Sequence, residues 1–343
     1  MSGNGVLIRC DGSPHTGLGH VVRCLALGRE LRDRHLRNVV FAMRGGPLGI
    51  SLVREAGFPV FETPKGADFD YVAWLAGAVG TTTAELLVLD VRDELTLHEV
   101  RSIRKRTGVR VAVIDDASDR RLAADDVFYP PVPQAFALEW PDFAGRVHTG
   151  WEWVLLRPEF AAEPRRVPHE PPVVLVTMGG SDPAGLTPRA VSALALVKGP
   201  IECLVLIGPG FGHDAELSEL LETSPHETRI VRDGDVRAQM LAADFAVLSF
   251  GVTAYEAAAC ALPAVHLCLT DDHALSSSAM EEAGIAVSLG LAEAVEEARL
   301  VEAVEVLLAD NAGRGAMGTR ARSLVDGGGL LRIASVITAG RSE

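Results

Sequence analysis

The sequence predicts an α/β protein built from two doubly wound, Rossmann-like domains, each a parallel sheet with helices on both faces. Three observations support this fold class. The chain of 343 residues is long enough for two domains of ordinary size. Apolar runs alternate with helical stretches, which is typical of βαβ units. The stretch 161–172, AAEPRRVPHEPP, carries four prolines and separates two halves of similar rhythm. We therefore predict an N-terminal domain over 1–160, a linker over 161–172 and a C-terminal domain over 173–343.

The N-terminal half contains five apolar runs that we interpret as strands: Val6–Ile8, Val39–Met43, Pro59–Phe61, Leu86–Asp90 and Val109–Ile114. Helical stretches lie between them at 21–34, 47–56, 68–79 and 93–107. The strands are continuous in β-branched residues or leucine and do not alternate with polar residues. Such strands suit a parallel sheet that is buried on both faces.

The same rhythm begins again after the linker, with a strand, a glycine-containing loop and a helix from Thr187 to about Val197. The predicted strands of this half are Val173–Met178, Glu202–Ile207, Thr228–Val231, Phe245–Leu248, Ala264–Leu269 and Ala286–Ser288. In doubly wound sheets, ligands bind outside the carboxyl ends of the strands. Two such domains facing each other across a cleft would hold a ligand between them.

The composition is that of a globular protein, with 48% hydrophobic and 23% charged residues. The net charge of −14 argues against nucleic acid or an anionic membrane as the main partner. The sequence shows neither a signal-peptide pattern nor an apolar run of membrane-spanning length. Its five scattered cysteines lack metal-binding spacing and are expected to be reduced, mostly buried thiols. We expect a cytoplasmic protein without a metal, a cofactor or stable membrane association; the oligomeric state stays open.

The most informative segment is Gly17-Leu18-Gly19-His20-Val21-Val22-Arg23, between the first predicted strand and the first predicted helix. Backbone amides at a helix start favour anions. Histidine is the side chain that exchanges a proton most readily near neutral pH. The segment therefore resembles an anion cradle with a proton acceptor beside it. The alternative is ordinary turn chemistry, with His20 as a capping or packing residue.

Three loops of the C-terminal half follow strands and should meet at its ligand edge: Gly179–Asp182, Phe250–Glu256 and Thr270–His273. Thr253 can offer a hydroxyl and helix-start amides to a phosphate. Glu256 stands three residues later, so it either caps that helix in a capping box or binds two ribose hydroxyls. The string from Thr270 to His273 is equally typical of an exposed helix N-terminus.

Five motifs together resemble one family in the right order over nearly the whole chain. They are GLGHVVRCLALGREL from residue 17, LLRPEF at 155–160, VTMGGSDPAGLT at 176–187, ADFAVLSFGVTAYEAAACALPAV at 243–265 and DGGGLLRI at 326–333. The family is the UDP-sugar hydrolases of pseudaminic acid biosynthesis (PseG), with the related spore-coat polysaccharide proteins (SpsG). The C-terminal motifs alone are shared more widely with glycosyltransferases of the two-Rossmann-domain GT-B type. The resemblance therefore implies the GT-B fold.

The resemblance implies catalytic roles in the N-terminal half. His20 matches the family's essential histidine, which activates the water that displaces the nucleoside diphosphate. In our hypothesis of a hydrolase, Asp115, Asp116 or Asp11 orients that histidine. The segment that faces the sugar and the diphosphate also contains Gly17, Gly19 and Arg23.

In the C-terminal half, the resemblance implies a nucleotide-binding role. The residues matched to the diphosphate are Gly180, Ser181, Gly251 and Thr253. Glu256 matches the ribose-binding carboxylate, and backbone groups near Val231 and Arg232 would hold the base, which is uracil in the family.

Two departures from the family concern the sugar side. Many relatives carry an asparagine–glutamine pair where this chain has Asp271, Asp272 and His273. The extra carboxylate suggests that Asp272 and His273 meet an amino substituent where relatives meet an acetamido group. The asparagine-rich segment expected after Asp116 is also missing.

Three functions follow from these observations. The first is a hydrolase that releases a free sugar and UDP from a nucleotide-activated deoxyamino sugar, with His20 as general base. The second is a glycosyltransferase that uses the same nucleotide-sugar donor with a small-molecule or lipid acceptor. The third is a catalytically silent nucleotide-sugar-binding protein, which the presence of both His20 and Glu256 disfavours.

Overall fold

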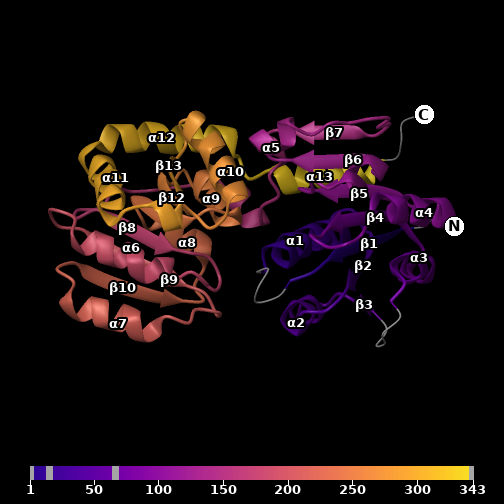
Figure 1. The fold of residues 1–343 in the computed structure, drawn as a ribbon, viewed down its shortest axis with the longest axis horizontal. Helices are drawn as coiled ribbons and strands as arrows, with labels where there is room; N and C mark the ends of the chain where they lie inside the picture. The colour runs from indigo at the N-terminus through magenta and orange to yellow at the C-terminus, as the bar shows by residue number, and fades with distance from the viewer. Residues whose placement is uncertain (1–3, 13–17, 64–68, 340–343) are drawn as a thin grey trace. The chain divides into compact units, whose positions relative to one another are not determined.

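The computed structural model describes residues 4–12, 18–63 and 69–339, and these form two compact units (Figure 1). The first unit comprises 1–131, 135–157 and 328–343. The second comprises 132–134 and 158–327. Each unit is an α/β structure with its own sheet and core, which confirms the predicted fold class.

The described part of the first unit contains a seven-stranded parallel sheet in the order β3-β2-β1-β4-β5-β6-β7. Its strands are β1 (Gly5–Cys10), β2 (Asn38–Met43), β3 (Val60–Glu62), β4 (Ala84–Asp90), β5 (Arg110–Ile114), β6 (Asp126–Tyr129) and β7 (Arg146–Thr149). The chain runs outward from β1 through β2 to β3 and then returns to place β4 on the other side of β1. The strand order therefore reverses between β1 and β4, where ligands bind in doubly wound sheets.

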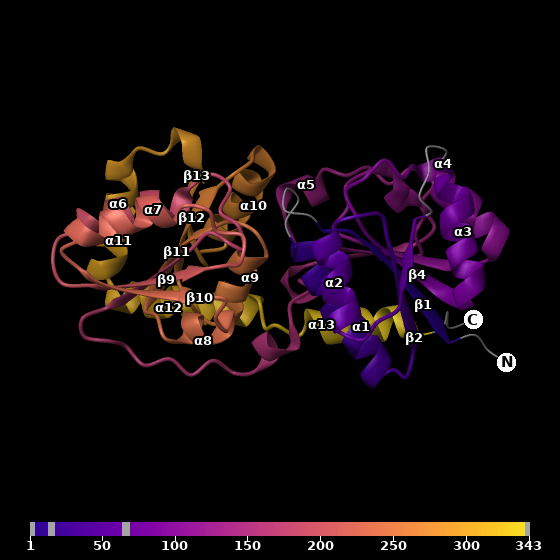
Figure 2. The same cartoon turned by 90° about the horizontal axis from the view of Figure 1, so that it is seen from below.

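Helices cover both faces of this sheet (Figure 2). One face carries α1 (Gly19–Asp33), α2 (Pro47–Glu55) and α13 (Gly329–Thr338), and the other carries α3 (Tyr71–Thr82) and α4 (Leu97–Thr107). The short elements η1 (Asp119–Ala123) and η2 (Trp151–Trp153) belong to this unit, α5 (Pro133–Phe136) spans the boundary between the units, and η3 (Pro158–Ala161) belongs to the second unit. Local sequence explains the ends of α4: Thr96 and Glu99 form a capping box, and Gly108 ends the helix at φ 74°.

The second unit has, in its described part, a six-stranded parallel sheet in the order β10-β9-β8-β11-β12-β13. Its strands are β8 (Val173–Thr177), β9 (Glu202–Ile207), β10 (Glu227–Arg232), β11 (Phe245–Ser249), β12 (Ala264–Cys268) and β13 (Val287–Leu291). The switch point here lies between β8 and β11, which pair directly.

The helices of the second unit also pack on both faces of its sheet. They are α6 (Leu186–Ala195), α7 (Asp214–Thr223), α8 (Val236–Leu241), α9 (Val252–Ala259), α10 (Asp271–Glu282), α11 (Glu297–Ala309) and α12 (Asn311–Leu324), with the short η4 (Ala292–Ala294). The core between the sheet and α6, α7 and α11 is aliphatic, as expected for strands that are buried on both faces.

The domain boundaries differ from the predicted ones at the C-terminus. The sequence places all of 173–343 in the second domain, but the structure assigns α13 to the first unit. The reason is packing, because Leu330, Ile333, Ala334 and Ile337 are buried in the core that α1 shares.

The proline-rich stretch 161–172 has no regular structure, as predicted, but it belongs to the second unit. The guanidinium of Arg166 donates to the carbonyls of Ala243, Asp244 and Ala261. The carboxylate of Asp244 accepts from the backbone amide of Val173 at 2.8 Å. The stretch is therefore fastened to the unit that follows it.

Two glycines of the DGGG motif allow two chain segments to pass very closely. A Cβ on Gly327, which has φ +73°, would lie 2.3 Å from the carbonyl oxygen of Phe160. A Cβ on Gly329 would lie 2.1 Å from the carbonyl oxygen of Val154. The LLRPEF and DGGGLLRI motifs thus pack side by side, Gly329 within the first unit and Gly327 within the second.

Among the helices that the structure describes, none is long and apolar enough to cross a membrane.

Candidate functional site

The first turn of α1 directs three side chains at one carboxylate. His20, Arg23 and Cys24 stand at i, i+3 and i+4, so they share a face of the helix. Asp90 is the last residue of β4, the strand beside β1, and its side chain is fully buried. His20 Nδ1 lies 2.6 Å from Asp90 Oδ1, and Arg23 contacts both carboxylate oxygens at 2.6 Å. The Cys24 thiol donates to Asp90 Oδ2 at 3.3 Å.

This geometry settles the protonation of the His20 ring. A carboxylate only accepts hydrogen bonds, so the 2.6 Å contact requires a hydrogen on Nδ1. In the neutral ring, Nε2 then carries a lone pair. The His20 side chain is 23% exposed whereas that of Asp90 is 0% exposed. The imidazole is therefore anchored at one nitrogen and can accept a proton at the other.

The electrostatics keep Asp90 ionised. Burial by itself raises the pKa of the Asp90 carboxyl, but Arg23 and then His20 outweigh it and hold that pKa well below its usual range. Burial by itself would lower the pKa of Arg23, but the charge and hydrogen bonds of Asp90, together with the charge of Asp115, raise that pKa above its usual value. The pair is thus charged on both sides at neutral pH.

A second carboxylate flanks this pair. Asp115, directly after β5, has a left-handed backbone at φ 52°. Its Oδ2 lies 3.3 Å from Arg23 Nη1 and 3.7 Å from Arg92 Nη2. The side chain is 32% exposed. Asp115 therefore contacts Arg23 and Arg92 and makes no hydrogen bond to the His20 imidazole.

Asp11 has other partners in the structure. Its carboxylate accepts from Arg9 Nη2 at 2.5 Å and from the backbone amide of Arg44 at 2.7 Å. Arg9 is fully buried and also reaches Asp93 at 2.9 Å. Asp116 pairs with Arg120. The carboxylate that contacts His20 is Asp90, which the sequence reasoning missed.

A signal for Asp90 was present in the sequence. It ends the apolar run LLVLD, and a carboxylate at the carboxyl end of a buried parallel strand faces the ligand edge. What the sequence lacks is the pairing of β4 with β1, which places Asp90 beside the start of α1.

Of the two glycines of the opening motif, the structure describes only Gly19. Gly19 is the first residue of α1 and is exposed, and the N-cap residue Leu18 makes no side-chain cap hydrogen bond. Gly17 lies outside the described residues.

In the second unit, the loop after β8 contains a carboxylate, that of Asp182, which binds the backbone amides at the start of α6. Asp182 accepts from the backbone amides of Leu186 and Thr187 at 2.8 and 2.7 Å. The amides at the start of α6 therefore already have an anion. Gly180 and Ser181 lie just before Asp182, and they pack against the loop after β9, where Gly210 N donates to Gly180 O at 2.9 Å.

The loop after β11 leads straight into α9. Gly251 is the N-cap residue of α9 and makes no side-chain cap hydrogen bond. Thr253 is the second residue of the helix and is partly buried, and Glu256 lies one turn further and is 6% exposed. The capping-box alternative for Glu256 is wrong, because Thr253 lies inside the helix and is not its cap.

The string from Thr270 to His273 forms the start of α10. The hydroxyl of Thr270 accepts from the backbone amide of His273 at 3.2 Å, and Asp271 and Asp272 occupy the first turn. The helix-N-terminus interpretation is thus confirmed. The ring of His273 lies 5.7 Å from that of Phe250, so the loops after β11 and β12 are neighbours.

Val231 and Arg232 end β10, the edge strand of this sheet. The guanidinium of Arg232 pairs with Asp214 at the start of α7. These two residues lie two strands from β8, whereas the other predicted contacts follow the adjacent strands β8, β11 and β12.

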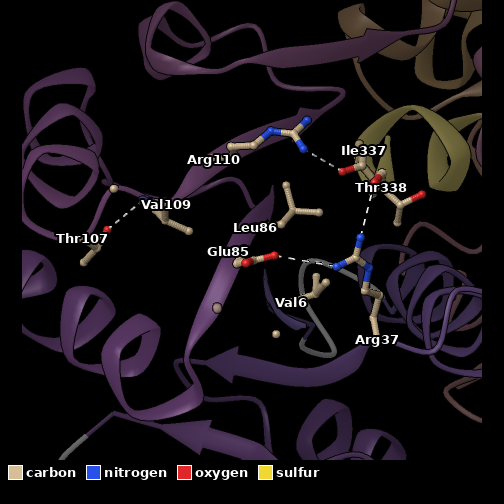
Figure 3. A pocket seen from close by; sticks show the side chains of 12 residues that line it. Val6, Arg37, Glu85, Leu86, Thr107, Val109, Arg110, Ile337 and Thr338 are labelled. Atoms are coloured by element: carbon tan, nitrogen blue, oxygen red, sulfur yellow. Dashed lines mark hydrogen bonds and ion pairs between the residues drawn. The ribbon is translucent and has the colours of Figure 1, made fainter. Parts of the chain in front are cut away.

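A pocket of about 510 Å³ lies at the opposite, amino-terminal edge of the first sheet (Figure 3). Arg37 and Arg110 project toward the last turn of α13 and donate to the carbonyls of Thr338, Ile337 and Ala339 at 3.3 Å. These carbonyls are the ones that a helix end leaves without a partner. The pocket therefore belongs to the docking of α13 and not to the ligand edge.

The five cysteines are free and buried, as the sequence predicts. Within 4–12, 18–63 and 69–339, no group of three or more histidine, cysteine, aspartate or glutamate side chains could hold a metal ion.

Comparison with known proteins places this geometry in context. No family model matches the chain. It is 22% identical to the spore coat polysaccharide biosynthesis protein SpsG of Bacillus subtilis over 338 residues, which cover 96% of each chain. It is 27% identical over 196 residues to the UDP-2,4-diacetamido-2,4,6-trideoxy-beta-L-altropyranose hydrolase of Campylobacter jejuni, covering 56% of this chain and 66% of that protein.

Solved structures show the same fold at low sequence identity. MurG of Acinetobacter baumannii superposes with a TM-score of 0.74 at 14% identity, covering 97% of this chain and 99% of that one. The calicheamicin glycosyltransferase CalG4 superposes with a TM-score of 0.65 at 17% identity, covering 98% of both chains. HepE of Anabaena, in complex with UDP-glucose, gives 0.60 at 14% identity, covering 97% of this chain and 98% of that one. In sequence the chain is thus similar to SpsG and to a UDP-sugar hydrolase, and it has the two-domain α/β fold of these GT-B glycosyltransferases.

Proposed function

We propose that this protein is a hydrolase of a nucleotide-activated sugar, with His20 as its general base. Relatives and structural neighbours support a nucleotide-sugar enzyme: one relative is named as a UDP-sugar hydrolase and one neighbour was solved with UDP-glucose. They do not separate hydrolysis from glycosyl transfer. The choice of hydrolysis rests on the opening motif that this chain shares with the hydrolase-type relatives.

The observation that carries the proposal is the 2.6 Å hydrogen bond between His20 Nδ1 and buried Asp90. It leaves Nε2 as the proton acceptor on a partly exposed ring. In the proposed reaction, His20 Nε2 takes a proton from water as the water oxygen bonds to the anomeric carbon. The bond from that carbon to the diphosphate oxygen breaks, and the nucleoside diphosphate leaves with the electron pair. A diphosphate is a good leaving group, so one base plus charge stabilisation is sufficient.

The second unit would bind the nucleotide. The start of α9 has no side-chain cap, so its amides remain available to a phosphate, with the Thr253 hydroxyl beside them. The start of α6 is capped by Asp182, which makes α9 the better diphosphate site. Glu256 would bind the ribose hydroxyls, and backbone groups near Val231 and Arg232 would contact the base.

The sugar is expected to carry an amino substituent, because Asp272 and His273 stand in the first turn of α10 beside the Phe250 loop. A carboxylate pairs with an ammonium group and has less to offer an acetamido group. Comparing matched amino and acetamido UDP-sugars would test this choice, and faster turnover of the acetamido sugar would contradict it.

An acceptor-free assay separates hydrolysis from transfer. The protein is incubated with a panel of UDP-deoxyamino sugars and no alcohol or amine acceptor, and UDP release is followed. We expect steady multiple turnover. UDP release that appears only after an acceptor is added would make the protein a glycosyltransferase.

Replacing His20 by asparagine tests the base. His20→Asn should lower kcat by about 10²- to 10⁴-fold, the usual contribution of a positioned general base. UDP affinity, measured by calorimetry, should not change. His148→Asn is a matched control, because His148 also contacts a buried carboxylate, Asp126, at 3.0 Å, but it lies on β7, the edge strand, three strands away from β4. Loss of UDP binding together with turnover in His20→Asn would make His20 a structural residue.

A further inference from the structure

The buried carboxylate of Asp90 is saturated by donors from a single helical turn. Oδ1 accepts from His20 Nδ1 and Arg23 Nη2, and Oδ2 accepts from Arg23 Nε and Cys24 Sγ. Each oxygen therefore has two donors, which is its full capacity. The spacing i, i+3, i+4 is the one that puts three side chains on one face of a helix. This accounts for the HxxRC spacing of the opening motif, of which the mechanism uses only the histidine.

Asp90 cannot rotate away from His20 without breaking the other bonds. The bidentate pair with Arg23 fixes the plane of the carboxylate, since both guanidinium contacts are 2.6 Å. The carboxylate is fully buried, so water does not compete for it. Arg23 itself is held from a second side by Asp115.

The other titratable and charged groups near the His20 imidazole lie at the ends of strands β1, β4 and β5. Cys10 at the end of β1 contacts the Cys24 thiol, Arg92 follows β4, and Asp115 follows β5. Arg23 Nη2 also lies 3.1 Å from His20 Nδ1. A guanidinium can only donate, and Arg23 Nη2 already donates to Asp90 Oδ1 at 2.6 Å, so the shorter contact between Nδ1 and Asp90 determines that the hydrogen lies on Nδ1.

We propose that Asp90 is the positioning residue of the reaction: it holds His20 as the Nδ1–H tautomer, with Nε2 ready to take the proton, and Arg23 and Cys24 lock Asp90 in that role. The inference rests on the proposed function for its kinetic consequence, but the tautomer itself is a property of the resting protein.

The kinetic test is Asp90→Asn, which keeps the shape but replaces one oxygen by an amide NH₂. The Arg23 guanidinium will donate to the remaining oxygen, so the new NH₂ group faces His20. An NH₂ group donates a hydrogen bond, so Nδ1 must accept it and the imidazole hydrogen moves to Nε2. We expect kcat to fall on the order of 10³-fold, with KM and UDP affinity unchanged.

Asp126→Asn is the matched control. Asp126 is also a buried carboxylate, 1% exposed, with Arg146 at 2.8 Å and His148 at 3.0 Å. It begins β6 and so lies at the amino-terminal edge of the sheet. Its replacement should lower stability and leave kcat unchanged. If Asp90→Asn and Asp126→Asn have the same kcat as the wild type, or lower it equally, Asp90 is not a positioning residue.

The spectroscopic test uses unmodified protein, so it holds even if Asp90→Asn does not fold. ¹⁵N-labelled histidine spectra distinguish a protonated ring nitrogen from one with a lone pair, and the signals missing from His20→Asn assign His20 among the ten histidines. We expect Nδ1–H in the wild type. An Nε2–H ring in the wild type would overturn the proposal.

The outcomes also separate this inference from the proposed function. If no UDP-sugar is hydrolysed but His20 is Nδ1–H, the positioning geometry stands and the proposed function fails. If His20→Asn abolishes turnover while Asp90→Asn does not, the function stands and the positioning role fails.

Discussion

Arg23 and Asp90 form an ion pair that the surrounding protein hides from water, and such pairs behave unlike surface ones. The Asp90 side chain is 0% exposed and that of Arg23 is 12% exposed. Removing one partner of a buried pair leaves a charge that neither water nor protein compensates. Removing one partner should therefore lower the free energy of unfolding strongly. Replacing both partners by apolar residues of similar volume should change it much less.

Arg23→Ala is predicted to destabilise the protein by about 3–5 kcal/mol at pH 7. The dependence on pH follows from the sign of the shift. In the wild type, the pKa of Asp90 lies below its unfolded value, so the stability it contributes is present at neutral pH and is lost as the pH falls below about 4. In Arg23→Ala, the strongest influence that lowers the pKa of Asp90 is removed while burial still raises it, so the penalty is largest at pH 7 and shrinks on acidification.

Urea unfolding of both proteins at pH 7, 5.5 and 4 measures this difference. Arg32→Ala is the control, because Arg32 and Asp33 form an exposed pair and its loss should change stability little. A gap between wild type and Arg23→Ala that stays constant or widens toward pH 4 would contradict the assignment of charges.

At the scale of elements, the approach of LLRPEF to DGGGLLRI depends on glycine where α13 begins. A methyl group at Gly329 would meet the Val154 carbonyl at 2.1 Å, which is backbone and cannot move aside cheaply. We predict that Gly329→Ala destabilises the protein by about 1–3 kcal/mol, the usual cost of overpacking. Chemical denaturation measures the change.

Gly315→Ala is the matched control, because Gly315 also lies in a helix but has open space around its Cβ position. It should stabilise the protein by about 0.5–1 kcal/mol through helix propensity. If both substitutions changed the free energy of unfolding equally, the backbone at Val154 could move away from Gly329 at little cost, and the prediction would be wrong.

The strands and helices of each sheet could be predicted because buried parallel strands appear as continuous apolar runs, as in β4 and β11. The short strands β6 and β7 escaped prediction, since DVFY and RVHT carry charges that pair across the sheet: Asp126 with Arg146 and His148. The membership of α13 also escaped it. An amphipathic helix shows which of its faces is apolar, but not which of two cores receives that face.

The candidate site shows the same limit. His20 could be found from the strand–loop–helix pattern around it. Its carboxylate partner could not, because Asp90 lies 70 residues away and becomes a neighbour only through the pairing of β4 with β1. Asp11 was the nearer choice in sequence, but its oxygens face Arg9 and the amide of Arg44. The nucleotide side of the predicted site stays a prediction.

At the scale of the whole molecule, the first unit is discontinuous and needs α13 to complete its core. Ile333 is fully buried there and Leu330 and Ile337 are 1% exposed. We predict that a chain ending at Gly327 retains nucleotide binding in the second unit but loses turnover, because the face of α1 that α13 covers is left open to water. Calorimetric titration with UDP and an acceptor-free turnover assay measure the two properties.

Ile333→Ala is the milder version of the same change. It should cost about 2–5 kcal/mol, as for other buried isoleucines replaced by alanine. Val306→Ala serves as the control, because Val306 is 60% exposed on α11. A truncated chain that hydrolyses nucleotide-sugars at the wild-type rate would show that the first unit folds without α13.

The placement of α13 has a consequence for how the chain folds as it is synthesised. Residues 158–327 are contiguous and contain all but three residues of the second unit, so nearly all of this unit is made before Gly329–Thr338. The strands of the first unit are made first, but its core is complete only when Gly329–Thr338 has been added. Domains usually fold in the order in which they leave the ribosome. Here the order of completion is reversed, because the unit that carries His20 begins first and is completed last.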